Sequence, residues 1–85
     1  MAEPLAQPER LTLLTRPGCH LCEVAREAME HVSVASGVPW REVDITTDPD
    51  LEAEYTDRIP VVLLDGREHG YWRVEEARLL RDLMG

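Results

Sequence analysis

Two cysteines separated by two residues carry the clearest chemistry in this sequence. They stand in Cys19-His20-Leu21-Cys22, directly after Arg16-Pro17-Gly18. Residues three apart in the first turn of a helix stand on one face, with Cβ atoms ~5–6 Å apart. A modest adjustment then lets the two sulfur atoms form a bond of ~2.05 Å. This spacing at the start of a helix indicates a redox-active cysteine pair.

The two cysteines are predicted to have different roles. The first is expected at a helix N-terminus, where free backbone N–H groups and the helix dipole favour an anion. Thiolates in Cys-x-x-Cys motifs at such positions have pKa values of ~3.5–7.5, below the ordinary ~8.5. We therefore expect Cys19 to be the nucleophile and Cys22, one turn further into the helix, to be the resolving thiol.

Other interpretations of the cysteine pair have different requirements. A structural zinc site needs four ligands, yet the sequence has no second Cys-x-x-Cys, and His20, His31 and His69 follow no zinc-binding spacing. Attachment of a c-type haem needs a histidine directly after the second cysteine, and Glu23 occupies that position. Two inert cysteines in a non-catalytic domain remain an alternative. Because neither the zinc spacing nor the haem spacing is met, no metal ligands are assigned.

Composition and charge exclude several other classes of function. The 85 residues include 17 acidic and nine basic side chains, all nine of them arginine, and the net charge is −8. No basic face for nucleic acid is visible, and the negative charge opposes binding to anionic membranes. No apolar run approaches the ~20 residues of a membrane span, and residues 1–9 lack a secretory signal. A cytoplasmic location is expected, where cysteines stay reduced and a structural disulfide is rare.

The flanking patterns predict an α/β domain in the order β-α-β-α-β-β-α. Strands are expected at 10–15, 40–45, 60–64 and 67–71, and helices at 20–36, 49–55 and 74–84. The first two strands should be parallel, and the Asp65-Gly66 turn should add an antiparallel hairpin, which gives a four-stranded mixed sheet. Residues 1–9 are expected to be a flexible tail and residues 10–85 a single domain.

The helical periodicity also predicts the core. On the first helix the core face is expected to contain Leu21, Val24, Ala25, Ala28, Met29, Val32 and Ala35. On the last helix it is expected to contain Ala77, Leu80, Leu83 and Met84. Trp40 is expected to pack in the core, whereas Trp72 fits either core packing or an exposed recognition surface.

Two segments resemble glutaredoxins, which have the thioredoxin fold. They are Thr15–Cys22, reading Thr-Arg-Pro-Gly-Cys-His-Leu-Cys, and Arg58–Val62, reading Arg-Ile-Pro-Val-Val. The turn sequence Leu64–Arg67 supports the resemblance, which covers about residues 10–84 and is strongest to small bacterial glutaredoxin-like proteins. It implies thiol–disulfide oxidoreductase activity.

The resemblance also implies residues that bind substrate. Arg16 matches a basic residue that holds the thiolate and a glutathione carboxylate. Ile59-Pro60 matches a Val-Pro with a cis peptide bond, and the residue before that proline pairs its backbone with the substrate's cysteine. Gly70 and Arg73 fall in the stretch where glutaredoxins use Gly-Gly and a following Asp to hold the γ-glutamyl carboxylate.

Three residues depart from the glutaredoxin pattern. His20 replaces a proline, and it is either a titratable group beside the thiolate or a solvated side chain without a role. Tyr71 replaces the second glycine, and Arg73 stands at the Asp position. A bulky ring can block the close backbone approach that glycine permits, although Arg73 can still bind a carboxylate. These changes predict poor use of glutathione.

The sequence thus predicts exchange of protein or small-molecule disulfides by a monomer with no bound cofactor. Glutathione, another low-molecular-weight thiol or a flavoprotein reductase would restore the dithiol, and the residues do not choose among them. Two alternatives stay open. One is a module that binds glutathione or an iron–sulfur cluster, as some glutaredoxins do, and the other is a non-catalytic thioredoxin-fold adaptor.

Overall fold

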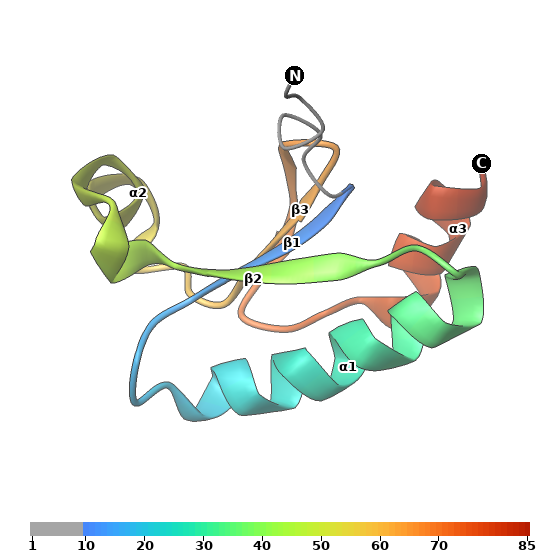
Figure 1. The fold of residues 1–85 in the computed structure, drawn as a ribbon, viewed down its shortest axis with the longest axis horizontal. Coiled ribbons are helices and arrows are strands. Elements are labelled where there is room, and N and C mark those ends of the chain that lie inside the picture. Colours follow the sequence, from blue (N-terminus) through green and yellow to red (C-terminus); the bar gives the residue numbers. More distant parts are fainter. Residues whose placement is uncertain (1–9) are drawn as a thin grey trace, which may run out of the picture.

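The computed structural model describes residues 10–85 and contains one mixed four-stranded sheet in the order β2-β1-β3-β4 (Figure 1). The strands are β1 (Leu11–Thr15), β2 (Trp40–Asp44), β3 (Val61–Leu64) and β4 (Arg67–Tyr71). β1 pairs parallel with β2 and antiparallel with β3, and β3 forms an antiparallel hairpin with β4. The predicted element order and mixed sheet are confirmed. The predicted flexible tail, residues 1–9, lies outside the described residues.

Three α-helices surround this sheet unequally. α1 (His20–Ser36) and α3 (Glu76–Met84) pack on one face, while α2 (Pro49–Tyr55) lies beyond one end of the sheet (Figure 1). A short 3-10 helix, η2 (Ile45–Thr47), joins β2 to α2 and was not expected from the sequence. The opposite face of the sheet therefore lacks a long covering helix.

The helix ends follow from local sequence. Gly37 ends α1 in the left-handed conformation (φ +76°), and its N–H donates to the Ser33 carbonyl at 2.8 Å. At α2 the Asp48 carboxylate accepts the backbone N–H of Asp50 at 2.9 Å, and Pro49 occupies the first turn. These predicted boundaries are confirmed. The start of α3 is not, because this helix begins two residues later than expected, at Glu76.

The core of α1 differs from the prediction at its two ends. Ala25, Met29 and Val32 are buried against β1 and α3, as expected, and Ala28 is half-buried. The expected burial of Leu21 and Val24 is wrong, because these side chains are 50% and 56% exposed. They lie in the first turns of α1, toward the cysteine end of the helix and away from its contact with α3 (Figure 1). Ala35, near the other end, is exposed as well.

The buried stripe of α3 runs through Leu79 and Leu83, with Leu80 half-buried beside it. The prediction missed Leu79 and wrongly placed Ala77 and Met84 in the core, since both are exposed. One residue along a helix turns the side-chain direction by about 100°, so the buried face of α3 lies about one residue position away from the predicted face.

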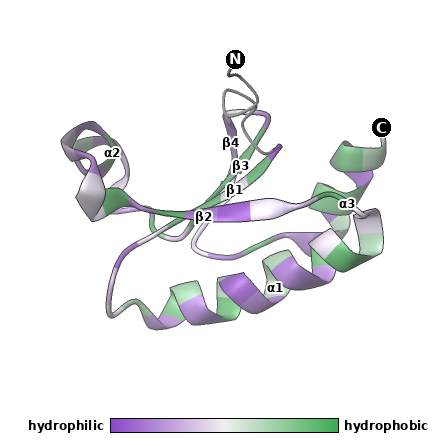
Figure 2. Cartoon of the chain, in the orientation of Figure 1, coloured by the Kyte–Doolittle hydropathy of each residue, from purple (hydrophilic) through white to green (hydrophobic). Residues whose placement is uncertain are grey.

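The two tryptophans lie in different surroundings. Trp40 is half-buried against the core, and its indole N–H donates to Glu30 Oε1 at 3.1 Å. Trp72 is 55% exposed, which favours the surface interpretation over the core interpretation. Figure 2 shows the apolar residues of α1 alternating with polar ones along the helix.

Candidate active site around Cys19 and Cys22

The loop after β1 places Cys19 as the N-cap of α1. Its backbone is extended (φ −97°, ψ 110°), and its Sγ accepts a hydrogen bond from the backbone N–H of Cys22 at 3.2 Å. Gly18 precedes it with φ +74°, a conformation that glycine adopts without steric cost. Cys19 is half-buried, and its sulfur lies against the first turn of α1. This position favours negative charge on a ligand or side chain.

Cys22 lies behind Cys19 in an apolar cluster. Its side chain is fully buried and packs with Leu14, Ile45 and Ile59. Burial raises the pKa of the Cys22 thiol to about 11, and its hydrogen bond with Cys19 adds to the rise. The Arg16 backbone and the positive charge of Arg26 oppose this rise but do not cancel it. Cys22 is therefore a protonated thiol at neutral pH, and the two cysteines are chemically distinct.

This raised pKa makes protein stability depend on pH. The Cys22 thiol has a pKa of about 11 in the folded protein, against an ordinary pKa of about 8.5–9, so it stabilises the fold fully below that ordinary pKa and the contribution is lost as the pH rises to 11. We expect the free energy of unfolding to fall by about 2–3 kcal/mol across this range. Urea unfolding under reducing conditions at several alkaline pH values would measure the change.

The matched control for the alkaline measurement is Cys22→Ala. This variant should be less stable at neutral pH but should lose less stability between pH 9 and pH 11. All other ionisable side chains are present in both proteins, so the difference between the two pH profiles reports on Cys22. Parallel pH profiles for the two proteins would contradict the assigned Cys22 environment.

The sequence analysis missed a hydrogen-bonded group that Arg26, one turn after Cys22 in α1, forms with Glu42 and Thr15. The Arg26 guanidinium donates to both carboxylate oxygens of Glu42 at 2.9 and 2.8 Å, and Thr15 Oγ1 donates to the same carboxylate at 2.7 Å. The Arg26 guanidinium lowers the pKa of the Glu42 carboxyl. These contacts tie α1 to β2 and to the end of β1 that leads into the cysteine loop. No local pattern predicts them, because the partners come together only through the β1–β2 pairing.

The loop before β3 lies beside the cysteines. Its Ile59–Pro60 peptide bond is cis, both residues are buried, and Ile59 shares the apolar cluster of Cys22. Arg16 is exposed, and its Nη1 donates to the Thr56 carbonyl at 3.4 Å. The structure thus brings Ile59 together with the cysteine pair, and Arg16 links the cysteine loop to the end of α2.

The other two predicted binding residues lie around the end of β4. Gly70 is within the strand, paired with Val62, and a Cβ at this glycine would stand 3.4 Å from the Arg78 guanidinium. Arg73 has a side chain that is 81% exposed, and its Nε donates to Glu75 Oε2 at 2.8 Å. Gly70 therefore sits in a strand pair, whereas Arg73 follows β4 in the exposed loop before α3.

An exposed apolar surface joins this loop to the start of α1. Leu21, Val24, Trp72 and Arg73 are among the residues that line a shallow groove of about 170 Å³. Trp72 has the unusual φ of +71°, its N–H donates to the Pro60 carbonyl at 2.7 Å, and its ring lies edge-on to Tyr71 at 5.0 Å. The contact with Pro60 holds this aromatic pair next to the loop that borders the cysteines.

Residues 10–85 hold no group of three or more His, Cys, Asp or Glu side chains arranged to bind a metal ion. Within the same residues, no helix is both long and apolar enough to cross a membrane.

His20 is exposed, and its Nδ1 lies 4.0 Å from Glu23 Oε1.

Comparison with known families agrees with this arrangement. A family model described as a glutaredoxin-like domain (DUF836) matches residues 10–84. The chain belongs to this glutaredoxin-like family. An uncharacterized protein of Mycobacterium bovis is 43% identical over 84 residues, covering 93% of this chain and 86% of its own. A Mycobacterium tuberculosis protein, also uncharacterized, matches to the same extent.

Solved structures share the fold of this glutaredoxin-like chain. A structural genomics target protein from X. campestris is 36% identical with a TM-score of 0.70, covering 87% of this chain and 95% of its own. A protein from Nitrosomonas europaea, solved by NMR, is 23% identical with a TM-score of 0.72 over 93% of this chain and 94% of its own. A thioredoxin from Fasciola hepatica, 20% identical over 91% of this chain and 81% of its own, has a TM-score of 0.58. The last two similarities concern the fold alone.

Proposed function

We propose that this glutaredoxin-like protein catalyses thiol–disulfide exchange, with Cys19 as the nucleophile and Cys22 as the resolving thiol. The observation that supports this proposal is that the two cysteines differ in exposure. Cys19 Sγ is partly accessible at the start of α1 and accepts the Cys22 N–H at 3.2 Å, whereas the Cys22 side chain is fully buried one turn behind. An accessible sulfur suits attack on a substrate, and a buried neighbour suits the following intramolecular step.

The exchange has two steps. The Cys19 thiolate attacks one sulfur of a substrate disulfide, so that a mixed disulfide with Cys19 forms and the other substrate sulfur leaves as a thiolate. Cys22 then gives up its proton and attacks Cys19 Sγ, which releases the second substrate thiolate. The substrate gains two electrons, and the protein loses them in forming the Cys19–Cys22 disulfide. A thiol reductant or a flavoprotein reductase then restores the dithiol.

The high pKa of Cys22 keeps the proton on the Cys22 sulfur until the second step. While Cys22 remains a thiol, its S–H can donate to the Cys19 sulfur, an interaction that also contributes to the raised Cys22 pKa. Once Cys19 is in a mixed disulfide, its negative charge is gone, and the coulombic contribution of Cys19 to the Cys22 pKa disappears. Formation of the mixed disulfide therefore makes Cys22 easier to deprotonate for the second step.

The surrounding residues supply substrate binding. The backbone of Ile59 and Pro60 lies beside the cysteine pair, where a substrate cysteine would pair with the Ile59 backbone. Arg16 is exposed at the cysteine loop, where its guanidinium would attract a carboxylate of the substrate. At the γ-glutamyl end, the Tyr71 ring and Arg73 stand in place of glycine and aspartate. We therefore expect glutathione to be a poor reductant and another thiol or a reductase to be preferred.

A turnover assay tests this function. The protein should reduce both a small disulfide and a disulfide-bonded protein, slowly with a glutathione system and faster with another thiol or a thioredoxin-reductase system. The Cys19→Ser variant, which keeps the size of the side chain, should lose at least about 100-fold of the activity because it lacks the attacking sulfur. Equal rates for the two proteins with every reductant would contradict the proposal.

A further inference from the structure

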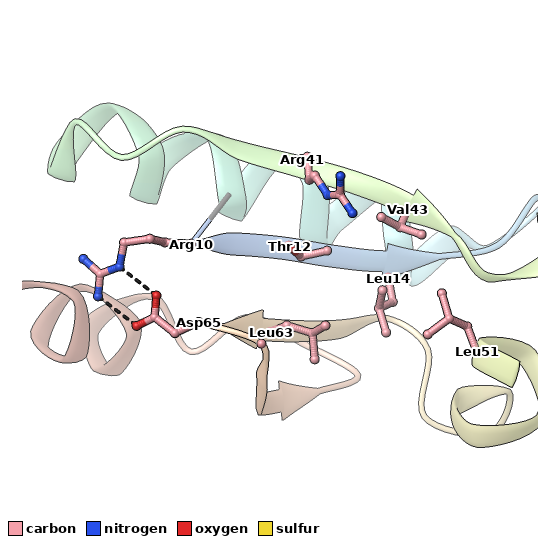
Figure 3. Close-up of a pocket in the computed structure, with 9 residues that line it drawn as sticks. Arg10, Thr12, Leu14, Arg41, Val43, Leu51, Leu63 and Asp65 are labelled. Carbon is pink, nitrogen blue, oxygen red and sulfur yellow. Dashed lines mark hydrogen bonds and ion pairs between the residues drawn. The ribbon is translucent and has the colours of Figure 1, made fainter. Parts of the chain in front are cut away.

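A trough crosses the sheet face that α1 and α3 leave uncovered. It is a cavity of about 460 Å³ between β2 and β3, closed at one end by α2, and Figure 3 shows its walls. Leu14, Val43, Leu51 and Leu63 supply its apolar surface. Known binding sites for small molecules have volumes of roughly 300–1,000 Å³ and mostly apolar walls. The trough falls within that range and lies apart from the groove beside the cysteines.

Strand alternation explains why this face is apolar. Leu11 and Leu13 of β1 point toward α1 and α3, so Thr12 and Leu14 point to the other face. In the strand pairing, Thr12 stands opposite Arg41 and Leu63, and Leu14 stands opposite Val43. These side chains form one continuous surface across three strands, and α2 reaches it only at one end, through Leu51 (Figure 3).

The charges at the two sides of the trough differ. The Arg10 guanidinium forms two hydrogen bonds to the Asp65 carboxylate, at 2.9 and 3.0 Å, so this side carries no net charge. Within residues 10–85, five of the nine arginines form ion pairs with acidic side chains, namely Arg10, Arg26, Arg58, Arg73 and Arg81. Arg41 forms none within residues 10–85, and its exposed guanidinium extends along the edge of the trough from β2 (Figure 3).

We infer that the trough binds a small amphiphile that has an apolar body and a single carboxylate. The apolar body would cover Leu14, Val43 and Leu63, and the carboxylate would pair with the Arg41 guanidinium, which has two parallel N–H donors for it. The net charge of −8 disfavours ligands that carry several negative charges. Arg41 has no acidic partner within residues 10–85, so the trough that it borders matches a monoanion, and this inference does not rest on the exchange reaction proposed above.

Titration with decanoate, followed by NMR of the full-length protein, tests this inference. Decanoate should produce saturable shifts at Thr12, Leu14, Val43 and Leu63, while the signals of the separate groove, at Leu21, Val24 and Trp72, stay unchanged. The Arg41→Ala variant should bind decanoate about tenfold more weakly, since it lacks the charge-assisted hydrogen bonds. Arg81→Ala is the matched control, because Arg81 is exposed on α3, at the other face of the sheet, and its loss should leave the affinity unchanged.

Two further comparisons separate shape from charge. Decanol, which has the same chain without the carboxylate, should bind equally to the unaltered protein and to Arg41→Ala. Thr12→Trp should fill the trough and abolish decanoate binding, whereas Thr12→Val should retain it. Thermal unfolding of both Thr12 variants would show that each is folded.

Several results would overturn the inference. One is the absence of saturable shifts, and another is shifts confined to the groove of Leu21, Val24 and Trp72. Equal decanoate affinity in Arg41→Ala and the unaltered protein would also contradict it. If the NMR signals of the trough residues change with protein concentration in the absence of decanoate, a second copy of the chain is the occupant. If Leu5→Asp changes the NMR signals of the trough residues before decanoate is added, the chain's own N-terminal segment is the occupant.

Discussion

The Cys22→Ser variant is expected to accumulate a mixed disulfide on Cys19 when it meets a disulfide-bonded peptide, to nearly one adduct per chain. In the unaltered protein the buried Cys22 thiol, one turn behind Cys19, would resolve this species. An intramolecular attack of this kind proceeds at an effective concentration far above that of any thiol in solution. A serine hydroxyl cannot replace the thiol, so the adduct should persist until an external thiol is added. Intact mass after acid quenching would measure it.

The control for this trapping experiment is Cys19→Ser, which keeps the buried thiol and removes the accessible one. It should form no adduct at neutral pH, because Cys22 is shielded from solvent and burial alone still raises the pKa of its thiol above the ordinary value. An adduct on Cys22 in Cys19→Ser, with none on Cys19 in Cys22→Ser, would reverse the assigned roles of nucleophile and resolving thiol.

The double variant Tyr71→Gly, Arg73→Asp is expected to raise glutathione-dependent turnover by roughly ten- to a hundredfold. That range corresponds to recovering a charge-assisted hydrogen-bond pair worth about 1.5–3 kcal/mol. In the unaltered protein the Tyr71 ring is half-exposed against Trp72, and the Arg73 guanidinium is held by Glu75. Removing the ring opens the backbone to the γ-glutamyl carboxylate, as glycine does in glutaredoxins. Initial rates at several glutathione concentrations would measure the effect.

A matched variant separates this effect from a general loosening of the loop. Tyr71→Phe with Arg73→Lys keeps the ring and the positive charge, so glutathione use should stay at its original level. Turnover with a thioredoxin-reductase system should be similar in all three proteins. If the unaltered protein already uses glutathione efficiently and the Tyr71→Gly, Arg73→Asp variant loses that activity, then Arg73 itself binds the carboxylate and the expectation is wrong.

Much of the fold was predictable because its signals are local. The left-handed Gly37 and the Asp48–Pro49 pair mark helix ends through backbone geometry that few other residues provide. The Asp65-Gly66 turn connects β3 and β4, and both of its residues have positive φ. The cysteine positions followed in the same way, since a Cys-x-x-Cys at a helix start places the first cysteine as the N-cap.

The features that could not be predicted depend on tertiary placement. Leu21 and Val24 satisfy the helical periodicity of α1, but the turns that carry them are exposed beside the Trp72 loop. The contact between Arg26 and Glu42 joins residues 16 positions apart through a parallel strand pair. The trough likewise arises because α2 is short and displaced toward one end of the sheet, a position that no sequence pattern encodes.

A redox titration of the Cys19–Cys22 pair tests the central claim most directly. The protein would be equilibrated in buffers of defined thiol–disulfide ratio, quenched with an alkylating agent, and analysed by mass with peptide mapping. We expect a single two-electron transition between the dithiol and an intramolecular Cys19–Cys22 disulfide. Its midpoint should lie between about −270 and −120 mV, the range of exchange proteins with this motif. Failure to form that disulfide, or oxidation of Cys19 alone while Cys22 stays reduced, would contradict the account.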